Sequence, residues 1–202
     1  GKPGVCLSTL GPGALNFTTG AAYAFLGAMP MIILTGQKGI RSSRQAQFQI
    51  VDIVNAMKPL TKSARQIVSP TTIPTLVRDA FRMAQEERPG PVLLELPEDI
   101  AGMECEAVPL VPPHALETPV AGAESVERAA AQIRAAQRPL VMLGAAASRP
   151  ASSAALSRFV LRAGIPFFTT QMGKGSVAGG SGLYMGTATP SERDHVHKAI
   201  DR

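Results

Sequence analysis

The sequence predicts an α/β fold, with parallel sheets and helices on both faces, organised as two incomplete Rossmann-like (doubly wound) domains. The first observation is that short apolar strands alternate with segments whose apolar residues recur at helical spacing. The second is composition: of 202 residues, 45% are hydrophobic, only 4% are aromatic and none is Trp, which suits aliphatic strands buried on both faces. The third is a Gly-Pro-Gly turn at residues 11–13, directly after the first strand, where parallel sheets bind ligands.

The first half of the chain carries three clear strands and the helices between them. Strands are predicted over residues 5–9, 31–35 and 92–96, with a weaker one near 60–64. Helices are predicted over 14–28, over the short apolar stretch 50–57, and from Ser69-Pro70, where Ser69 would be the N-cap. These elements form a predicted domain of residues 1–98.

Residues 99–121 form a predicted interdomain linker, because prolines crowd this region and helical periodicity disappears. A second domain is predicted over 122–202, with helices at 123–137 and about 152–163 and strands at 140–144 and 165–170. The chain starts beside a strand and stops within a helical pattern. Since domain ends usually fall in exposed linkers, we expect an internal piece of a longer protein.

Bulk properties exclude several function classes. The net charge is +5, and residues 38–65 hold six cations against the single Asp52, which could attract an anionic ligand. No aromatic stacking platform accompanies them, so no nucleic-acid partner is expected. No apolar run approaches the roughly 18 residues of a membrane span, so no membrane partner is expected. Cys6 and Cys105 lack metal-ligand spacing, and we expect reduced cysteines, no metal site and a cytoplasmic location.

The Gly11-Pro12-Gly13 loop is the strongest local signal for a site. Glycines allow the sharp turn, Pro12 fixes its own φ, and helix N-terminal amides face the same crevice. The alternative is a plain connection between a strand and a helix.

Three other groups of residues are weaker candidates. The loop 144–150 could receive a diphosphate, but it holds one glycine. His195 and His197 are two apart on a predicted helix, point to different faces and make a poor metal pair. Glu95, Glu98 and Asp99 close a strand beside prolines, and we interpret them as capping and solvated residues.

Several segments, taken in order, resemble thiamine-diphosphate (TPP) enzymes, and the acetolactate synthase large (catalytic) subunits in particular. Those that resemble the C-terminal part of the amino-terminal, pyrimidine-binding domain are residues 8–16, 30–37, 48–49, 60–62 and 87–99. Those that resemble the first half of the central domain are residues 138–144, 164–175 and 183–186.

The resemblance implies a longer enzyme that binds TPP and Mg²⁺ between domains of two subunits, as a homodimer or homotetramer with a possible regulatory subunit. The implied activity is decarboxylation of a 2-keto acid such as pyruvate and ligation of the resulting enamine to a second keto acid, in branched-chain amino acid biosynthesis. The activating Glu and the magnesium-binding motif of the family would lie before Gly1 and after Arg202. No catalytic residue is therefore expected in this piece, which alone should be inactive.

By the same resemblance, Gly11, Pro12 and Gly13 approach the pyrimidine ring of the cofactor. Asn16, Phe48 and Gln49 are implied to lie on the substrate side, as an amide donor, an apolar wall and a neutral donor. From the residues alone, the favoured interpretation is that Phe48 is a core aromatic and Gln49 a solvated loop residue.

Two departures from the family pattern bear on substrate and cofactor. Ile50 stands where many acetolactate synthases carry an acidic residue, and residues 185–189 replace a Gly-Met-His-Gly-like run of flavin-binding members, which leaves FAD open. One alternative is another TPP-dependent decarboxylase, carboligase or oxidase, acting on glyoxylate, an acyl-CoA or a sulfoaldehyde. A non-catalytic nucleotide-binding module is the other.

Overall fold

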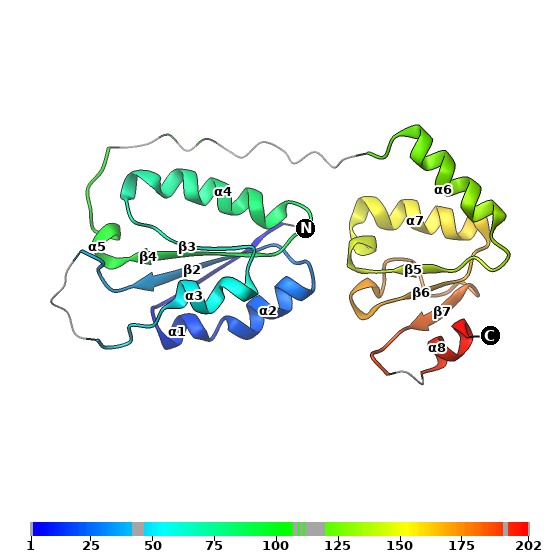
Figure 1. Cartoon of the computed structure of the whole chain (residues 1–202), viewed down its shortest axis with the longest axis horizontal. Helices are drawn as coiled ribbons and strands as arrows, with labels where there is room; N and C mark the ends of the chain where they lie inside the picture. The colour runs from blue at the N-terminus through cyan, green and yellow to red at the C-terminus, as the bar shows by residue number, and fades with distance from the viewer. Residues whose placement is uncertain are drawn as a thin grey trace. The chain divides into compact units, whose positions relative to one another are not determined.

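The computed structural model describes residues 2–41, 47–106, 109, 111, 120–191 and 194–201 (Figure 1). The chain divides into two compact units, Gly1–Glu117 and Thr118–Arg202, which are described separately below. A short helix, α5 (Glu98–Ala101), occupies the start of the stretch predicted as a linker, and most of positions 107–119 lie outside the described residues. The domain bounds 1–98, 99–121 and 122–202 stay a prediction.

The first unit is built on a four-stranded parallel sheet in the order β1-β2-β4-β3. The strands are β1 (Gly4–Ser8), β2 (Met31–Gln37), β3 (Ser63–Gln66) and β4 (Pro91–Pro97). The central pair is long and in register, from Met31 opposite Pro91 to Gln37 opposite Pro97. The parallel α/β class predicted from the sequence is therefore confirmed.

Helices cover both faces of this sheet because successive strand residues point to opposite sides. Helix α4 (Ile73–Gln85) packs on one face, against Ile32, Val92 and Leu94. The other face carries α1 (Pro12–Leu15), α2 (Thr18–Leu26) and α3 (Ile53–Met57), and their buried residues pack on Ile33 and Leu93 (Figure 1). Both central strands are thus buried on two sides.

Two predicted helices differ from the structure: one is divided in two, and the other starts later than predicted. The helix predicted over 14–28 is divided into α1 and α2, because the Phe17 N–H bonds the Ala14 carbonyl three residues back and tightens the turn. Ser69 precedes a 3-10 turn (Pro70–Thr72) rather than α4, whose N-cap is Thr72. The Ser69 hydroxyl bonds the Thr71 hydroxyl instead of capping a backbone N–H.

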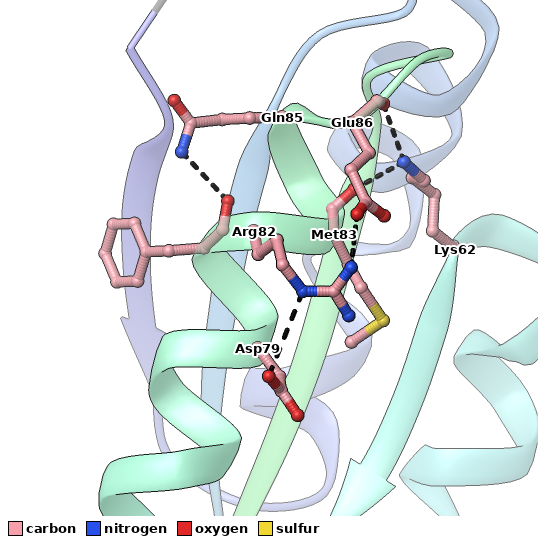
Figure 2. A network of polar contacts seen from close by, with 7 residues as sticks. Lys62, Asp79, Arg82, Met83, Gln85 and Glu86 are labelled. Carbon is pink, nitrogen blue, oxygen red and sulfur yellow. Dashed lines mark hydrogen bonds and ion pairs between the residues drawn. The ribbon is translucent and has the colours of Figure 1, made fainter. Parts of the chain in front are cut away.

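The end of α4 is held by a lysine from the neighbouring strand segment. Figure 2 shows the Lys62 ammonium directed at the last turn of the helix, where it donates to the carbonyls of Met83 and Glu86. Burial lowers the pKa of Lys62, while Glu86 acts in the opposite direction. A cation at this end neutralises carbonyls that have no partner within the helix.

We expect Lys62→Ala to lower the free energy of unfolding by about 1–2 kcal/mol, because two carbonyls lose a charged donor. Urea unfolding of the purified chain measures this. Lys58→Ala is the matched control, since the exposed Lys58 side chain donates only to the Asn55 side chain among the contacts described, and it should change stability by less than about 0.5 kcal/mol. Equal effects of the two substitutions would contradict the capping role.

The second unit has a three-stranded parallel sheet in the order β5-β6-β7. Its strands are β5 (Val141–Leu143), β6 (Phe167–Thr169) and β7 (Tyr184–Thr187), and its helices are α6 (Ala123–Ala135), α7 (Pro150–Ala163) and α8 (His195–Ile200). The core gathers around Phe167 on the central strand, with Leu143, Val160 and Val177. Strand β7 was not predicted, and its Gly186 has φ +119, which interrupts the strand pattern.

Helix α8 begins at a capping aspartate. Asp194 accepts the backbone N–H of His197 and both the backbone N–H and the hydroxyl of Thr189. These bonds hold the pKa of Asp194 below its usual value.

The described helices include none that is both long and apolar enough to cross a bilayer.

Candidate functional site

The candidate site lies at the carboxyl edge of the first sheet. Strand β1 ends at Ser8 and leads into the Gly11 loop, and β2 ends at Gln37 beside the last residues of β4. A Cβ built on Gly36 would lie 3.6 Å from the backbone nitrogen of Leu10, so the ends of β1 and β2 approach closely here. This is the edge at which open parallel sheets bind ligands.

Gly11 packs directly against Gln49, which the sequence places far along the chain. Gly11 has φ +57, and a Cβ at this position would lie 2.3 Å from the carbonyl oxygen of Gln49. Gln49 itself has φ +59, a left-handed conformation that a residue other than glycine seldom adopts. The structure thus brings the predicted cofactor loop and the predicted substrate residue into contact.

The rest of the Gly-Pro-Gly loop forms the start of α1. Pro12 lies in the first turn of this helix and is exposed, while Gly13 packs against side-chain atoms of Thr9 and Ser8. The exposed Asn16 ends the helix, and its backbone N–H bonds Pro12 and Ala14 carbonyls. Protein atoms fill the space beside Gly11 and Gly13, so Pro12 is the part of the loop that faces outward. Contact of residues 11–13 with a cofactor stays a prediction.

Phe48 and Gln49 both present their side chains to solvent in this unit. Phe48 is 70% exposed, which rules out the core aromatic considered above. An exposed aromatic ring beside a neutral amide suits one wall of a site for a small organic molecule. Residues 42–46, which include Arg44 of the basic stretch, lie outside the described residues.

Glu95 corrects the interpretation of the acidic residues at the end of β4. Its side chain is 2% exposed and accepts hydrogen bonds from the amides of Gln37 and Gln66, so it is neither solvated nor a cap. Burial raises the pKa of Glu95. Asp99 does bind backbone N–H groups, those of Arg41 and Ile100. The sequence does carry a sign of this burial, because Glu95 is the one acidic residue within the strand 91–97 and follows four apolar residues.

Beside Glu95 the surface is hollowed, with a volume of about 530 Å³. The wall includes Gln37 from β2, Ile50 and Val51 from the segment after Gln49, and Asn55 and Lys58 at α3. The lining combines neutral amides with two lysines, Lys38 and Lys58, and with the carboxylate of Asp52. Polar groups of both charges and of none therefore face the hollow, which suits a polar organic ligand.

The weaker candidates do not assemble into a site. Within the ranges that the structure describes, no group of three His, Cys, Asp or Glu residues could hold a metal ion. The loop 144–150 forms a 3-10 turn (Ala145–Ser148) that leads into α7. Cys6 is half-buried on β1 and Cys105 is exposed, and both are free thiols.

Comparison with known proteins gives two family matches in chain order. Residues 1–56 match the thiamine pyrophosphate enzyme, N-terminal TPP binding domain, and residues 126–202 match the thiamine pyrophosphate enzyme, central domain. The two matches fall one in each half of the chain, as the resemblance of the motifs predicted.

Curated relatives are similar along most of this chain. An acetolactate synthase of Arthrospira platensis is 33% identical over 180 residues, covering 87% of this chain and 31% of the relative. Acetolactate synthase 2, chloroplastic, of Nicotiana tabacum is 32% identical over 206 residues, covering 100% and 31%. The acetolactate synthase isozyme 1 large subunit of Escherichia coli is 40% identical over 146 residues, covering 71% and 26%.

The chain spans about a third of the length of the curated relatives it matches. The two family matches follow one another along the chain, and each falls on a unit with a parallel α/β architecture. The chain therefore belongs to the thiamine pyrophosphate enzyme family and carries sequence of its N-terminal TPP-binding and central domains.

Proposed function

We propose that this chain is part of an acetolactate synthase-like enzyme that uses TPP to decarboxylate pyruvate and join the remaining two-carbon unit to a second keto acid. The observation that carries the proposal is sequence similarity, because a single alignment with each relative named acetolactate synthase extends over both halves of the chain. The chain's exposed wall of Phe48 and Gln49, in contact with the Gly11 loop, supports a small organic substrate.

The residues present fit one side of such a site. The pyrimidine ring of TPP is the part that residues 11–13 would approach. This loop carries no charged side chain and exposes Pro12, so it offers a neutral surface to the ring. When bound, TPP would supply the nucleophilic carbon that allows the keto acid to lose its carboxyl group. Asn16 would donate an amide hydrogen bond to a substrate oxygen, Phe48 would exclude water, and Gln49 would orient the reacting carbonyl.

The direct test is product analysis with the longer protein that contains these residues, supplied with pyruvate, TPP and Mg²⁺. Formation of acetolactate would support the proposal, whereas turnover of glyoxylate, an acyl-CoA or a sulfoaldehyde in place of pyruvate would replace it with another TPP-dependent reaction. The 202-residue chain alone should form none, because it spans only about a third of its relatives. We also propose a homodimer or homotetramer, a possible regulatory subunit, Mg²⁺ as the metal and a cytoplasmic location.

In the longer enzyme, Gln49→Ala should lower kcat/KM for the keto acid by about tenfold or more, the effect of losing one hydrogen bond in a desolvated site. The affinity for TPP should change little, because Gln49 is assigned to the substrate. Steady-state kinetics with TPP titrated separately measures both quantities.

Gln47→Ala is the matched control, since Gln47 is an exposed glutamine two positions earlier on the same segment. Its kcat/KM should stay within about threefold of the wild-type value. If Gln49→Ala behaves like Gln47→Ala, Gln49 is a solvated loop residue and does not belong to the site.

A further inference from the structure

A buried carboxyl group lies behind the loop that carries the candidate substrate residues. Glu95 is 2% exposed, in a strand whose other residues up to that point are apolar. It stands in register with Thr35 on one side and Gln66 on the other. A carboxyl group removed from water is unfavourable unless hydrogen bonds compensate, so the partners of Glu95 indicate its role.

Each oxygen of Glu95 accepts one amide hydrogen bond. Gln37 Nε2 lies 3.0 Å from Oε1, and Gln66 Nε2 lies 2.6 Å from Oε2. Burial raises the pKa of Glu95, the bonds from Gln66 and Gln37 lower it, and the negative charge of Asp52 raises it further. The two amides thus supply what water would otherwise provide to the carboxylate.

The amide of Gln37 is held in one orientation by three bonds. Its Oε1 accepts the backbone N–H of Lys38 at 3.0 Å, and its Nε2 donates both to Glu95 and to the Val51 carbonyl, each at 3.0 Å. Rotation of this amide by half a turn would place an oxygen against two acceptors and lose all three bonds. Glu95 therefore keeps the Nε2 of Gln37 directed at Val51.

Val51 is two residues after Gln49, so this hydrogen bond fixes the segment that carries the substrate residues. The segment is also held at two other points. The Gln49 carbonyl packs against Gly11, and Asp52, the residue after Val51, caps α3 by accepting the Asn55 N–H. The left-handed conformation of Gln49 needs such restraint, because it is unfavourable for a residue with a side chain.

We propose that Glu95 is a positioning residue, which acts through Gln37 and the Val51 carbonyl to hold Phe48 and Gln49 in place on the substrate side of the site. The inference rests on the proposed function for its kinetic readout. Glu95 would touch no substrate atom, and its contribution would pass entirely through the 47–52 segment.

The kinetic test uses the longer enzyme with Glu95→Leu and Glu95→Gln. The leucine removes the acceptor for Gln37, and kcat/KM for pyruvate should fall about tenfold. The glutamine keeps an acceptor oxygen for Gln37, while its own Nε2 can face the Gln66 amide after that side chain rotates, so kcat/KM should stay within about threefold. Glu98→Gln is the control for lost negative charge, since Glu98 is exposed and pairs with Lys38 at 3.5 Å, and it should also stay within about threefold.

A double-variant cycle asks whether the effect passes through Gln49. In a Gln49→Ala background, Glu95→Leu should lower kcat/KM by clearly less than tenfold, because of the two side chains that it positions only Phe48 is still present. The proposal is overturned if the two losses multiply, or if Glu95→Gln is as damaging as Glu95→Leu, which would assign the charge itself to the reaction.

Hydrogen exchange separates failure of this inference from failure of the proposed function, because it needs no substrate. Backbone amides of residues 47–52 should exchange about tenfold faster in Glu95→Leu and at the wild-type rate in Glu95→Gln, while β4 amides stay protected in both. If the wild-type enzyme makes no acetolactate but this pattern is found, the positioning role stands and the proposed reaction falls. Unchanged exchange of the segment in folded Glu95→Leu would refute the positioning role.

Discussion

Gly11→Ala should lower the free energy of unfolding of the first unit by about 2–4 kcal/mol, one of the largest losses expected from a single methyl group in this chain. Two effects add. Alanine at φ +57 and ψ −123 would occupy a backbone region that residues with a Cβ rarely adopt, at a cost of about 1–3 kcal/mol. Its Cβ would also lie 2.3 Å from the Gln49 carbonyl oxygen, which is backbone and cannot rotate away. Urea unfolding measures the loss.

Gly20→Ala is the matched control, because a Cβ on Gly20 meets no atom within 4 Å and the residue lies inside helix α2. This substitution should stabilise the chain by up to about 1 kcal/mol, since alanine favours the helix. In the longer enzyme, Gly11→Ala should also lower kcat/KM, because it would displace Gln49, which we propose to orient the substrate. A Gly11→Ala chain as stable as Gly20→Ala would show that the two loops are not packed together.

Local signals in the sequence were enough to predict most of the fold. The strands at residues 31–37 and 91–97 begin with the apolar runs 31–34 and 91–94 and are bounded by Pro and Gly, and the parallel arrangement follows from the helices between them. Strand β7 was missed because it has only four residues and includes a glycine at φ +119. The 3-10 turn before α4 was missed because a Ser-Pro pair signals a helix start without fixing whether the first turn is α or 3-10.

The candidate site was predicted in part, and its missing part is non-local. The Gly-Pro-Gly turn is visible in the sequence, and its place after β1 follows from chain order. Its contact with Gln49 depends on how two loops far apart in the chain approach, which no local pattern encodes. Glu95 was grouped with Glu98 and Asp99 by proximity, although the apolar residues before it in β4 already implied burial. Its partners, Gln37 and Gln66, come from two other strands and become neighbours only in the sheet.

Phe167→Ala should be the most damaging core substitution in the second unit, with an expected loss of about 3–5 kcal/mol. Phe167 is 0% exposed on the central strand, and its ring lies 5.2 Å from that of Tyr184. Removing the ring leaves a cavity among Leu143, Val160 and Val177 and ends the aromatic contact. A compact unit of this size has a total stability of roughly 5–15 kcal/mol, so the loss would remove a large share of it.

The chain offers its own reporter for this measurement. It has no Trp and two Tyr residues, of which Tyr184 lies in the second unit, so tyrosine fluorescence in a Tyr23→Phe background follows that unit alone during urea unfolding. Phe159→Ala is the matched control, because Phe159 lies on α7 and is 40% exposed, and it should cost less than about 1.5 kcal/mol. The surface ring loses little burial, whereas the core ring is surrounded on all sides and the short strands around it can collapse only partly into the space. A Phe167→Ala loss no larger than that of Phe159→Ala would mean that the three-stranded sheet is not packed around Phe167.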